Sequence, residues 1–206
     1  MTEYQTRSLS CPAKLETRDA EDGTPIIEGY FAVFGDVYQM WDDASESIAP
    51  GAFAGSLGND IRALVNHDTT LVLGRNKAGT LELREDDRGL WGRIRINPND
   101  TDAMNLHSRV QRGDVSQCSI GFNVIREETE FLEDGGIHWT LREIDLHEVS
   151  VCTFPAYEGT EVTARKRDYD EIMKKKRQAW RDTMTARLRG EKHGTESDDE
   201  GKGPEG

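Results

Sequence analysis

Ser119 lies in an apolar segment whose residue types could support chemistry. The segment Cys-Ser-Ile-Gly-Phe (118–122) alternates in a way that predicts a strand. Ser119 and Gly121 then share one face, and the absent glycine side chain leaves room for another backbone to approach. A small residue packed beneath a helix explains Ser119 equally simply, and spacing alone favours that structural role.

His67 follows a second apolar segment, Ile-Arg-Ala-Leu-Val-Asn (61–66), and precedes Asp68. A histidine at a strand end beside a carboxylate has a pKa close to neutral pH and can act as a general base. A surface histidine in a loop is the commoner explanation for the same pattern. The other histidines (His107, His138, His147 and His193) lie in a helix, a hairpin, a strand and the tail.

Glu148 begins the segment Glu-Val-Ser-Val-Cys-Thr-Phe, and alternation puts it on one face with Ser150 and Cys152. A carboxylate on such a face needs a partner. A histidine imidazole would make Glu148 the third member of a nucleophile–base–acid set. An ion pair with Arg126 or Arg142 is the structural alternative, which the residues alone slightly favour.

Neither a metal nor a nucleotide cofactor is expected. No group of histidine, cysteine or acidic residues has the spacing of a zinc site, and the acidic pairs lack the pattern of a calcium loop. Glycine-rich phosphate-binding motifs are also missing. The three cysteines (Cys11, Cys118 and Cys152) are an odd number, so we expect reduced thiols.

Short apolar segments separated by turn residues predict a mainly β domain with helices, either a small antiparallel barrel or a sandwich. A polar loop is expected over 36–50 and a single helical turn over 52–57. A helix is expected after Asn99, with Ala103, Leu106 and Val110 on one face and Gly113 at its end. The predicted strands are 26–34, 61–66, 71–73, 80–84, 90–96, 116–125, 137–146 and 148–154.

The charge of the chain, −13 overall, is unevenly distributed. Residues 165–192 carry a local net of +6 and residues 193–206 a net of −4, which leaves −15 for residues 1–164. The acidic body argues against nucleic acid as its ligand. Residues 165–192 predict a basic amphipathic helix, which either remains exposed or binds a partner. The Gly- and Ser-rich residues 193–206 predict a disordered acidic tail.

Neither a membrane span nor a secretory signal is expected. No apolar segment approaches the roughly 20 residues that a membrane-spanning helix needs. The first ten residues have no apolar stretch. We therefore expect a soluble protein.

Four sequence blocks together resemble the prohead maturation proteases of HK97-type tailed phages. They occur in the order that this family has. The blocks are Gly-Tyr-Phe-Ala-Val-Phe (29–34) with Ile-Ala-Pro-Gly-Ala-Phe (48–53), Leu-Val-Asn-His-Asp (64–68), Val-Gln-Arg-Gly-Asp-Val-Ser-Gln-Cys-Ser-Ile-Gly-Phe (110–122) and Leu-His-Glu-Val-Ser-Val-Cys-Thr-Phe-Pro-Ala-Tyr (146–157). The family is similar in fold to the herpesvirus assemblins, which implies a small antiparallel β-barrel surrounded by helices.

The resemblance also implies roles for three residues. His67 matches the general base, Ser119 the nucleophile and Glu148 the acid that orients the imidazole. The family commonly has methionine where this chain has Cys118, and the arginines that assist the assemblin oxyanion have no counterpart here. Backbone N–H groups at 119–121 or a water are the remaining oxyanion candidates.

The implied organisation is a flexible segment (1–22), a protease domain (23–164), the basic helix (165–192) and the acidic tail (193–206). The implied activity is serine endopeptidase cleavage of scaffold, of major capsid protein and of the enzyme itself, inside the procapsid in the host cytoplasm. A homodimer is also implied, without membrane or specific nucleic-acid binding. Two alternatives remain open: a non-enzymatic scaffold or interaction module, and a protease that uses Cys118.

Overall fold

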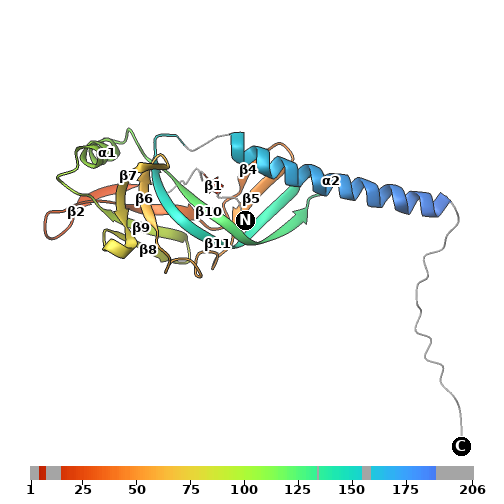
Figure 1. Ribbon diagram of the computed structural model, residues 1–206, viewed down its shortest axis with the longest axis horizontal. Coiled ribbons are helices and arrows are strands. Elements are labelled where there is room, and N and C mark those ends of the chain that lie inside the picture. Colours follow the sequence, from red (N-terminus) through yellow and green to blue (C-terminus); the bar gives the residue numbers. More distant parts are fainter. Residues whose placement is uncertain (1–4, 8–14, 134, 155–158, 189–206) are drawn as a thin grey trace, which may run out of the picture. The chain divides into compact units, whose positions relative to one another are not determined.

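The computed structural model describes residues 5–7, 15–133, 135–154 and 159–188, and the chain divides into two units, 1–162 and 163–206 (Figure 1). The first unit contains two β-sheets. The larger sheet has the order β1-β10-β11-β5-β4, with β6 pairing β11 and β7 pairing β6, and the smaller sheet has the order β2-β3-β9-β8. The strands are β1 (Gln5–Arg7), β2 (Glu16–Asp19), β3 (Pro25–Val33), β4 (Tyr38–Trp41), β5 (Ala44–Ile48), β6 (Arg62–Val65), β7 (Asp68–Arg75), β8 (Leu81–Glu85), β9 (Gly89–Arg95), β10 (Gln117–Phe131) and β11 (Ile137–Cys152).

The mainly β class with helices is confirmed, but the small antiparallel barrel surrounded by helices is wrong. The sheets do not close into a barrel. Instead, β11 pairs with two different strands along its length. It pairs in parallel with β5 over residues 137–141 and with β6 over residues 148–151. The larger sheet therefore branches, and its described part carries two parallel pairings. The described residues contain two α-helices.

The antiparallel hairpin of β10 and β11 is the longest element of the larger sheet, with strands of 15 and 16 residues. The sequence predicted β11 as two strands separated at His147, whereas it is continuous. It also predicted that β10 ends at residue 125, whereas residues 126–131, polar except for Phe131, extend the strand as a largely exposed ribbon. Polar residues suffice there because this part of β10 covers no core.

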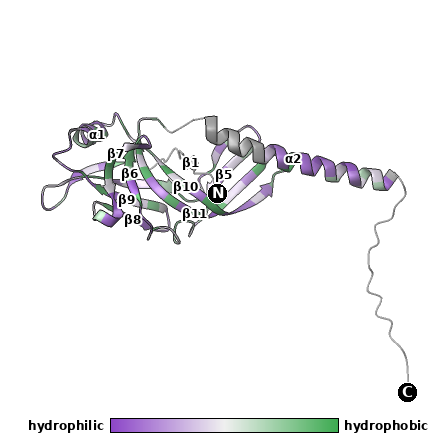
Figure 2. Cartoon of the chain, viewed as in Figure 1, coloured by the Kyte–Doolittle hydropathy of each residue, from purple (hydrophilic) through white to green (hydrophobic). Residues whose placement is uncertain are grey.

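Apolar residues of both sheets form one core, so the sheets pack face to face. Figure 2 shows apolar and polar residues alternating along several of these strands. Gly92 lets the backbone of β9 lie close to the Phe31 ring, because a Cβ at position 92 would be only 2.7 Å from that ring. Cys118 belongs to this core: its Sγ donates a hydrogen bond to the carbonyl of Tyr30 in β3 at 3.1 Å.

The loop predicted over 36–50 is partly wrong, since β4 and β5 form a hairpin there. Every residue of β5 is buried, including three polar ones, Ser45, Glu46 and Ser47. A strand with polar residues at its centre lacks the alternation that identifies strands in sequence. The helical turn expected over 52–57 is a series of turns, with Phe53 O accepting from the N–H groups of Ser56 and Leu57.

The predicted helix is confirmed as α1 (Thr101–Arg112). Asp100 caps its N-terminus by accepting from the N–H groups of Asp102 and Ala103, and Gly113 ends it with φ 87°. The buried face contains Ala103, Leu106 and Val110, as expected, and also His107. A 3₁₀ turn, η1 (Asn76–Ala78), lies between β7 and β8.

The second helix, α2 (Gly159–Leu188), begins before the basic segment expected over 165–192. Its described part is largely hydrophilic (Figure 2), and Trp180 is 62% exposed. No helix in the described ranges has the length and apolarity needed to cross a membrane. Strands β1 and β2 lie within the segment expected to be flexible (1–22), while the predicted tail (193–206) lies outside the described residues.

Candidate active site

His67 lies in a two-residue turn between β6 and β7. Val65 pairs with Asp68 across this turn, and the two central residues, Asn66 and His67, have φ of 49° and 61°. Positive φ at both central positions is the geometry of a type I′ turn, whose twist matches that of a β-hairpin. A histidine in the left-handed region is uncommon and is a feature found at functional sites.

Three hydrogen bonds hold this turn against β11. The N–H of Asn66 donates to the carbonyl of Val151 at 3.1 Å, and the Oδ1 of Asn66 accepts from the N–H of Thr153 at 2.9 Å. The N–H of His67 donates to Ser150 Oγ at 3.1 Å. The backbone of His67 is therefore fixed to the strand that carries Glu148.

Glu148 is buried and contacts His67 directly. Its Oε1 lies 2.6 Å from His67 Nδ1, and its Oε2 accepts a hydrogen bond from Ser150 Oγ at 2.6 Å. A carboxylate with both oxygens engaged can remain charged when it is only 3% exposed. The charge of Glu148 orients the imidazole with a proton on Nδ1, which leaves Nε2 to accept a proton.

A β-bulge at His147 gives Glu148 its direction. Phe122 of β10 pairs with Leu146, but its neighbour Gly121 pairs with Glu148, so His147 is the extra residue of β11. A bulge shifts the alternation of side chains by one position. The apolar residues on both sides of it then face the core, while Glu148 faces the opposite side of the sheet.

Ser119 lies on the same face of the larger sheet as Glu148. In the β10–β11 register Ser119 is opposite Ser150, and Gly121 is opposite Glu148. Residues directly opposite in an antiparallel pair share a face, with Cβ atoms about 5 Å apart. Ser119 is therefore the neighbour of the serine that binds both Glu148 and the backbone of His67. It is fully buried.

The pKa of His67 is raised above its ordinary value of 6.5. Burial lowers the pKa, but hydrogen bonds to Cys152 and Glu148 and the charge of Glu148 outweigh that effect. Cys152 Sγ lies 4.0 Å from His67 Nε2. The site therefore favours the imidazolium, the form that a general base adopts after it accepts a proton.

The ion-pair alternatives for Glu148 are not observed. Arg126 lies 3.8 Å from Glu143, and Arg142 lies 2.7 Å from Glu128. The other neighbouring histidine, His147, lies 3.7 Å from Asp145. The structure thus brings Glu148 to His67, and not to either arginine.

A second Ser–His cluster lies further along the larger sheet, where β5 pairs with β11. The Oγ atoms of Ser45 and Ser47 each lie 2.8 Å from a ring nitrogen of His138, Nδ1 and Nε2 respectively. Hydroxyl groups thus occupy both ring nitrogens of His138, whereas in the His67 site a carboxylate contacts Nδ1 and the Cys152 thiol lies 4.0 Å from Nε2. Glu46 is on the opposite face of β5 by alternation. The cluster lacks an orienting acid.

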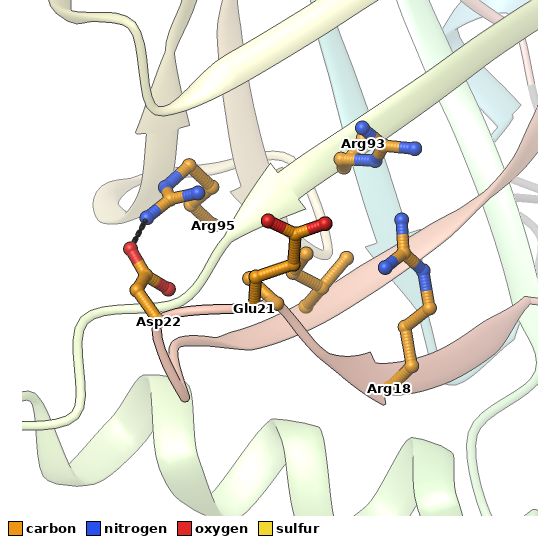
Figure 3. Close-up of a pocket in the computed structure, with 7 residues that line it drawn as sticks. Arg18, Glu21, Asp22, Arg93 and Arg95 are labelled. Atoms are coloured by element: carbon orange, nitrogen blue, oxygen red, sulfur yellow. Dashed lines mark hydrogen bonds and ion pairs between the residues drawn. The ribbon is translucent and has the colours of Figure 1, made fainter.

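An arginine-lined cavity of about 410 Å³ lies at the smaller sheet (Figure 3). Its charges are largely compensated, because Arg95 lies 2.6 Å from Asp22 and both Arg18 and Arg93 bind Glu28. Its lining residues include no serine, cysteine or histidine. This cavity is therefore not a second candidate for the same chemistry.

Sequence reasoning did not assign roles to Ser150 and Cys152, although it placed both on the face of Glu148. The signal was the period of two in Glu-x-Ser-x-Cys, which puts three polar or reactive side chains in a row. Ser150 positions two members of the site, and Cys152 contacts the imidazole edge.

Comparisons of the sequence with known proteins found one family and one relative that are similar to this chain. The sequence profile of the family described as "Caudovirus prohead serine protease" matches residues 12–175. The prohead protease of Enterobacteria phage HK97 is 34% identical over 154 residues, which cover 73% of this chain and 63% of that protein. The chain thus spans less than two thirds of this relative. No solved structure matches.

Proposed function

Because this chain belongs to the Caudovirus prohead serine protease family, we propose that it is a serine endopeptidase with Ser119 as nucleophile, His67 as general base and Glu148 as orienting acid. The observation that carries the proposal is the 2.6 Å contact between His67 Nδ1 and Glu148 Oε1 on the sheet face that Ser119 shares. The engaged Nδ1 leaves Nε2 as the basic atom.

The chemistry follows from these roles. As Ser119 Oγ attacks the peptide carbonyl carbon, His67 Nε2 accepts the hydroxyl proton and the carbonyl oxygen becomes an oxyanion. The imidazolium then gives that proton to the leaving amine, and the acyl group remains on Oγ. Water, deprotonated by His67, hydrolyses the ester and restores the serine. Glu148 stabilises the imidazolium in both halves.

Cys118 is a poor nucleophile for this site. It neighbours Ser119 in β10 and therefore faces the opposite side of the sheet. Its Sγ donates to the carbonyl oxygens of Tyr30 and Phe31, at 3.1 and 3.7 Å. A thiol held in the core between the sheets is remote from the face that bears the imidazole.

We further propose that the substrates are the major capsid protein, its scaffolding segment or a scaffold protein, and the chain itself, inside the procapsid in the host cytoplasm. The family description and the relative's name support a role in the prohead. A homodimer and docking through the basic helix α2 belong to the same proposal.

The test is co-expression with the major capsid protein of the same phage, followed by intact-mass measurement of both chains. We expect truncated capsid protein with the unmodified chain and only full-length protein with His67→Ala. If both chains leave the capsid protein and themselves at full mass, the non-enzymatic interaction module becomes the better explanation. The cleavage point found in this way provides a peptide substrate for kinetics.

Ser150→Ala is expected to lower kcat/KM roughly 10- to 100-fold, because it removes a hydrogen bond to a charged carboxylate and an anchor of the His67 backbone. Glu148 then loses a donor and binds the imidazolium more strongly, so the pH at half-maximal rate moves upward. Steady-state kinetics across pH measure both effects. Ser45→Ala, another buried hydroxyl bound to a histidine, is the control and should change neither.

A further inference from the structure

Strand β1 occupies the edge of β10 beside the proposed nucleophile (Figure 1). Its three residues pair antiparallel with β10, Gln5 with Phe122, Thr6 with Gly121 and Arg7 with Ile120. The next residue of β10 beyond the partner of Arg7 is Ser119. The opposite edge of β10 pairs with β11, which carries Glu148.

The direction of β1 is the direction that a substrate needs. Because the pairing is antiparallel, a peptide that runs along Phe122, Gly121 and Ile120 arrives next at Ser119. Backbone hydrogen bonds to a sheet edge hold an extended peptide in a fixed register. Residues that precede the scissile bond would then pair with β10, and the following carbonyl would reach Ser119 Oγ.

Gly121 suits the middle of such an edge. It shares a face with Glu148 and Ser119 but has no side chain there. A side chain of a bound peptide opposite Gly121 therefore finds space on the face that bears the site. On the other face, Ile120 and Phe122 are fully buried in the core, so the edge itself is rigid.

We propose that the β10 edge at Ile120–Phe122 binds the substrate as an extended strand, and that β1 is a tethered occupant of this site. The proposal rests on Ser119 being the nucleophile. Ser119 is fully buried, so a neighbouring group must move before a substrate carbonyl reaches it. β1 is the shortest described strand, and three residues form few backbone hydrogen bonds.

A tethered strand competes with substrate through its effective concentration, which is in the millimolar range for short flexible linkages. Weakening β1 should therefore improve binding of a free peptide without altering the catalytic residues. Successive N–H groups of a strand point to opposite sides, so one of the N–H groups of Gln5 and Thr6 faces β10. The double variant Gln5→Pro/Thr6→Pro therefore removes a backbone hydrogen-bond donor to β10 in either case. Gln5→Ala/Thr6→Ala keeps both N–H groups and is the matched control.

The first measurement is binding of a fluorescent peptide with the sequence of residues 1–7 to full-length Ser119→Ala protein, followed by anisotropy. We expect the proline pair to lower the Kd at least tenfold relative to the alanine pair. Deletion of residues 2–7 is a second variant, which removes the competitor without introducing proline, and it should behave as the proline pair does. Equal Kd values in all three proteins, or no binding to any, overturn the proposal. So does peptide-independent dimerisation of the variants, because the edge then accepts a second copy.

The second measurement is peptide cleavage with Ser119 intact. The proline pair and the deletion should lower KM several-fold with kcat unchanged, whereas the alanine pair should not. If the variants bind the strand peptide but no protein cleaves a substrate, the strand-binding edge stands and the proposed function fails. If all proteins cleave with the same KM and the variants lose only thermal stability, β1 is a structural strand and the inference fails.

Discussion

Ser119→Ala is expected to abolish peptide cleavage, with a fall in kcat of roughly 10⁴- to 10⁶-fold. Without Oγ no acyl-enzyme forms, and His67 and Glu148 have no proton donor to act upon. Loss of one catalytic member costs about as much as loss of the whole set, because the members act as a unit. Initial rates with a peptide that spans the capsid cleavage point measure the effect.

The fold should survive this change. Alanine retains the Cβ of Ser119 and fits a fully buried strand position. Ser47→Ala is the matched control, because it removes the Oγ that lies 2.8 Å from His138 Nε2, the analogous nitrogen in the second Ser–His cluster. We expect that control to cleave normally. Unchanged cleavage by Ser119→Ala, or inactivity of Ser47→Ala with the fold intact, would transfer the nucleophile role away from Ser119.

Cys118→Ala separates the serine mechanism from the thiol alternative. Its Sγ faces the carbonyls of β3, so its loss leaves a small cavity in the core and costs stability. Cleavage should persist below the lowered unfolding temperature. The pair of variants therefore predicts opposite outcomes for adjacent residues: an inactive stable protein at 119 and an active, less stable protein at 118.

Local sequence marked each residue of the proposed site as a candidate, although spacing alone favoured structural roles for Ser119 and Glu148. Ser119 and Gly121 alternate with apolar neighbours in a strand, and His67 follows an apolar strand at a turn. Their separations of 52 and 29 residues along the chain do not show that the three meet. The resemblance to a protease family implied that they meet, and the β6–β11–β10 order puts the strand that carries Glu148 between the strand that leads to His67 and the strand that carries Ser119.

The bulge at His147 was visible in the sequence but not recognised. The apolar residues Ile144, Leu146, Val149 and Val151 are spaced by two, three and two, and all face the core. An interval of three within a period of two is what one extra residue produces. Alternation alone puts Glu148 and Leu146 on one face, whereas the bulge separates them.

Local sequence patterns could not show whether the sheets close into a barrel. Short strands with turn residues are common to barrels and to sandwiches. The difference here depends on β11, whose edge first receives β5 and then β6. Neighbours of this kind are far apart in sequence, and β5 has a polar centre that conceals it. Long-range pairing of polar strands leaves no periodic signal.

Glu148→Gln is expected to lower kcat about 10³- to 10⁴-fold with little change in the backbone. The amide is nearly isosteric with the carboxylate, but it has one acceptor atom where Glu148 has two. Ser150 Oγ donates to Oε2 in the unmodified protein. If the amide oxygen keeps that hydrogen bond, its NH₂ group faces His67 Nδ1. The imidazole proton then moves to Nε2, which cannot accept the proton of Ser119.

The pH dependence of the cleavage rate provides a second test of Glu148→Gln. The pKa of His67 is raised above 6.5, in part by the hydrogen bond and charge of Glu148. A general base acts in its neutral form, so the rate of the unmodified enzyme should rise as the pH approaches the raised pKa of His67, about 10. Glutamine removes the charge, so the pKa falls and the rising limb moves to lower pH, while the maximum rate also falls.

Two measurements check these expectations. Rate profiles that extend on both sides of the His67 pKa of about 10 locate the limb, and the downfield proton resonance of Nδ1 reports the tautomer. Glu143→Gln on the same strand is the control, since that carboxylate pairs with Arg126 at the surface. Less than a tenfold loss in Glu148→Gln, or an unmoved limb, would show that Glu148 supports the fold and does not tune the base.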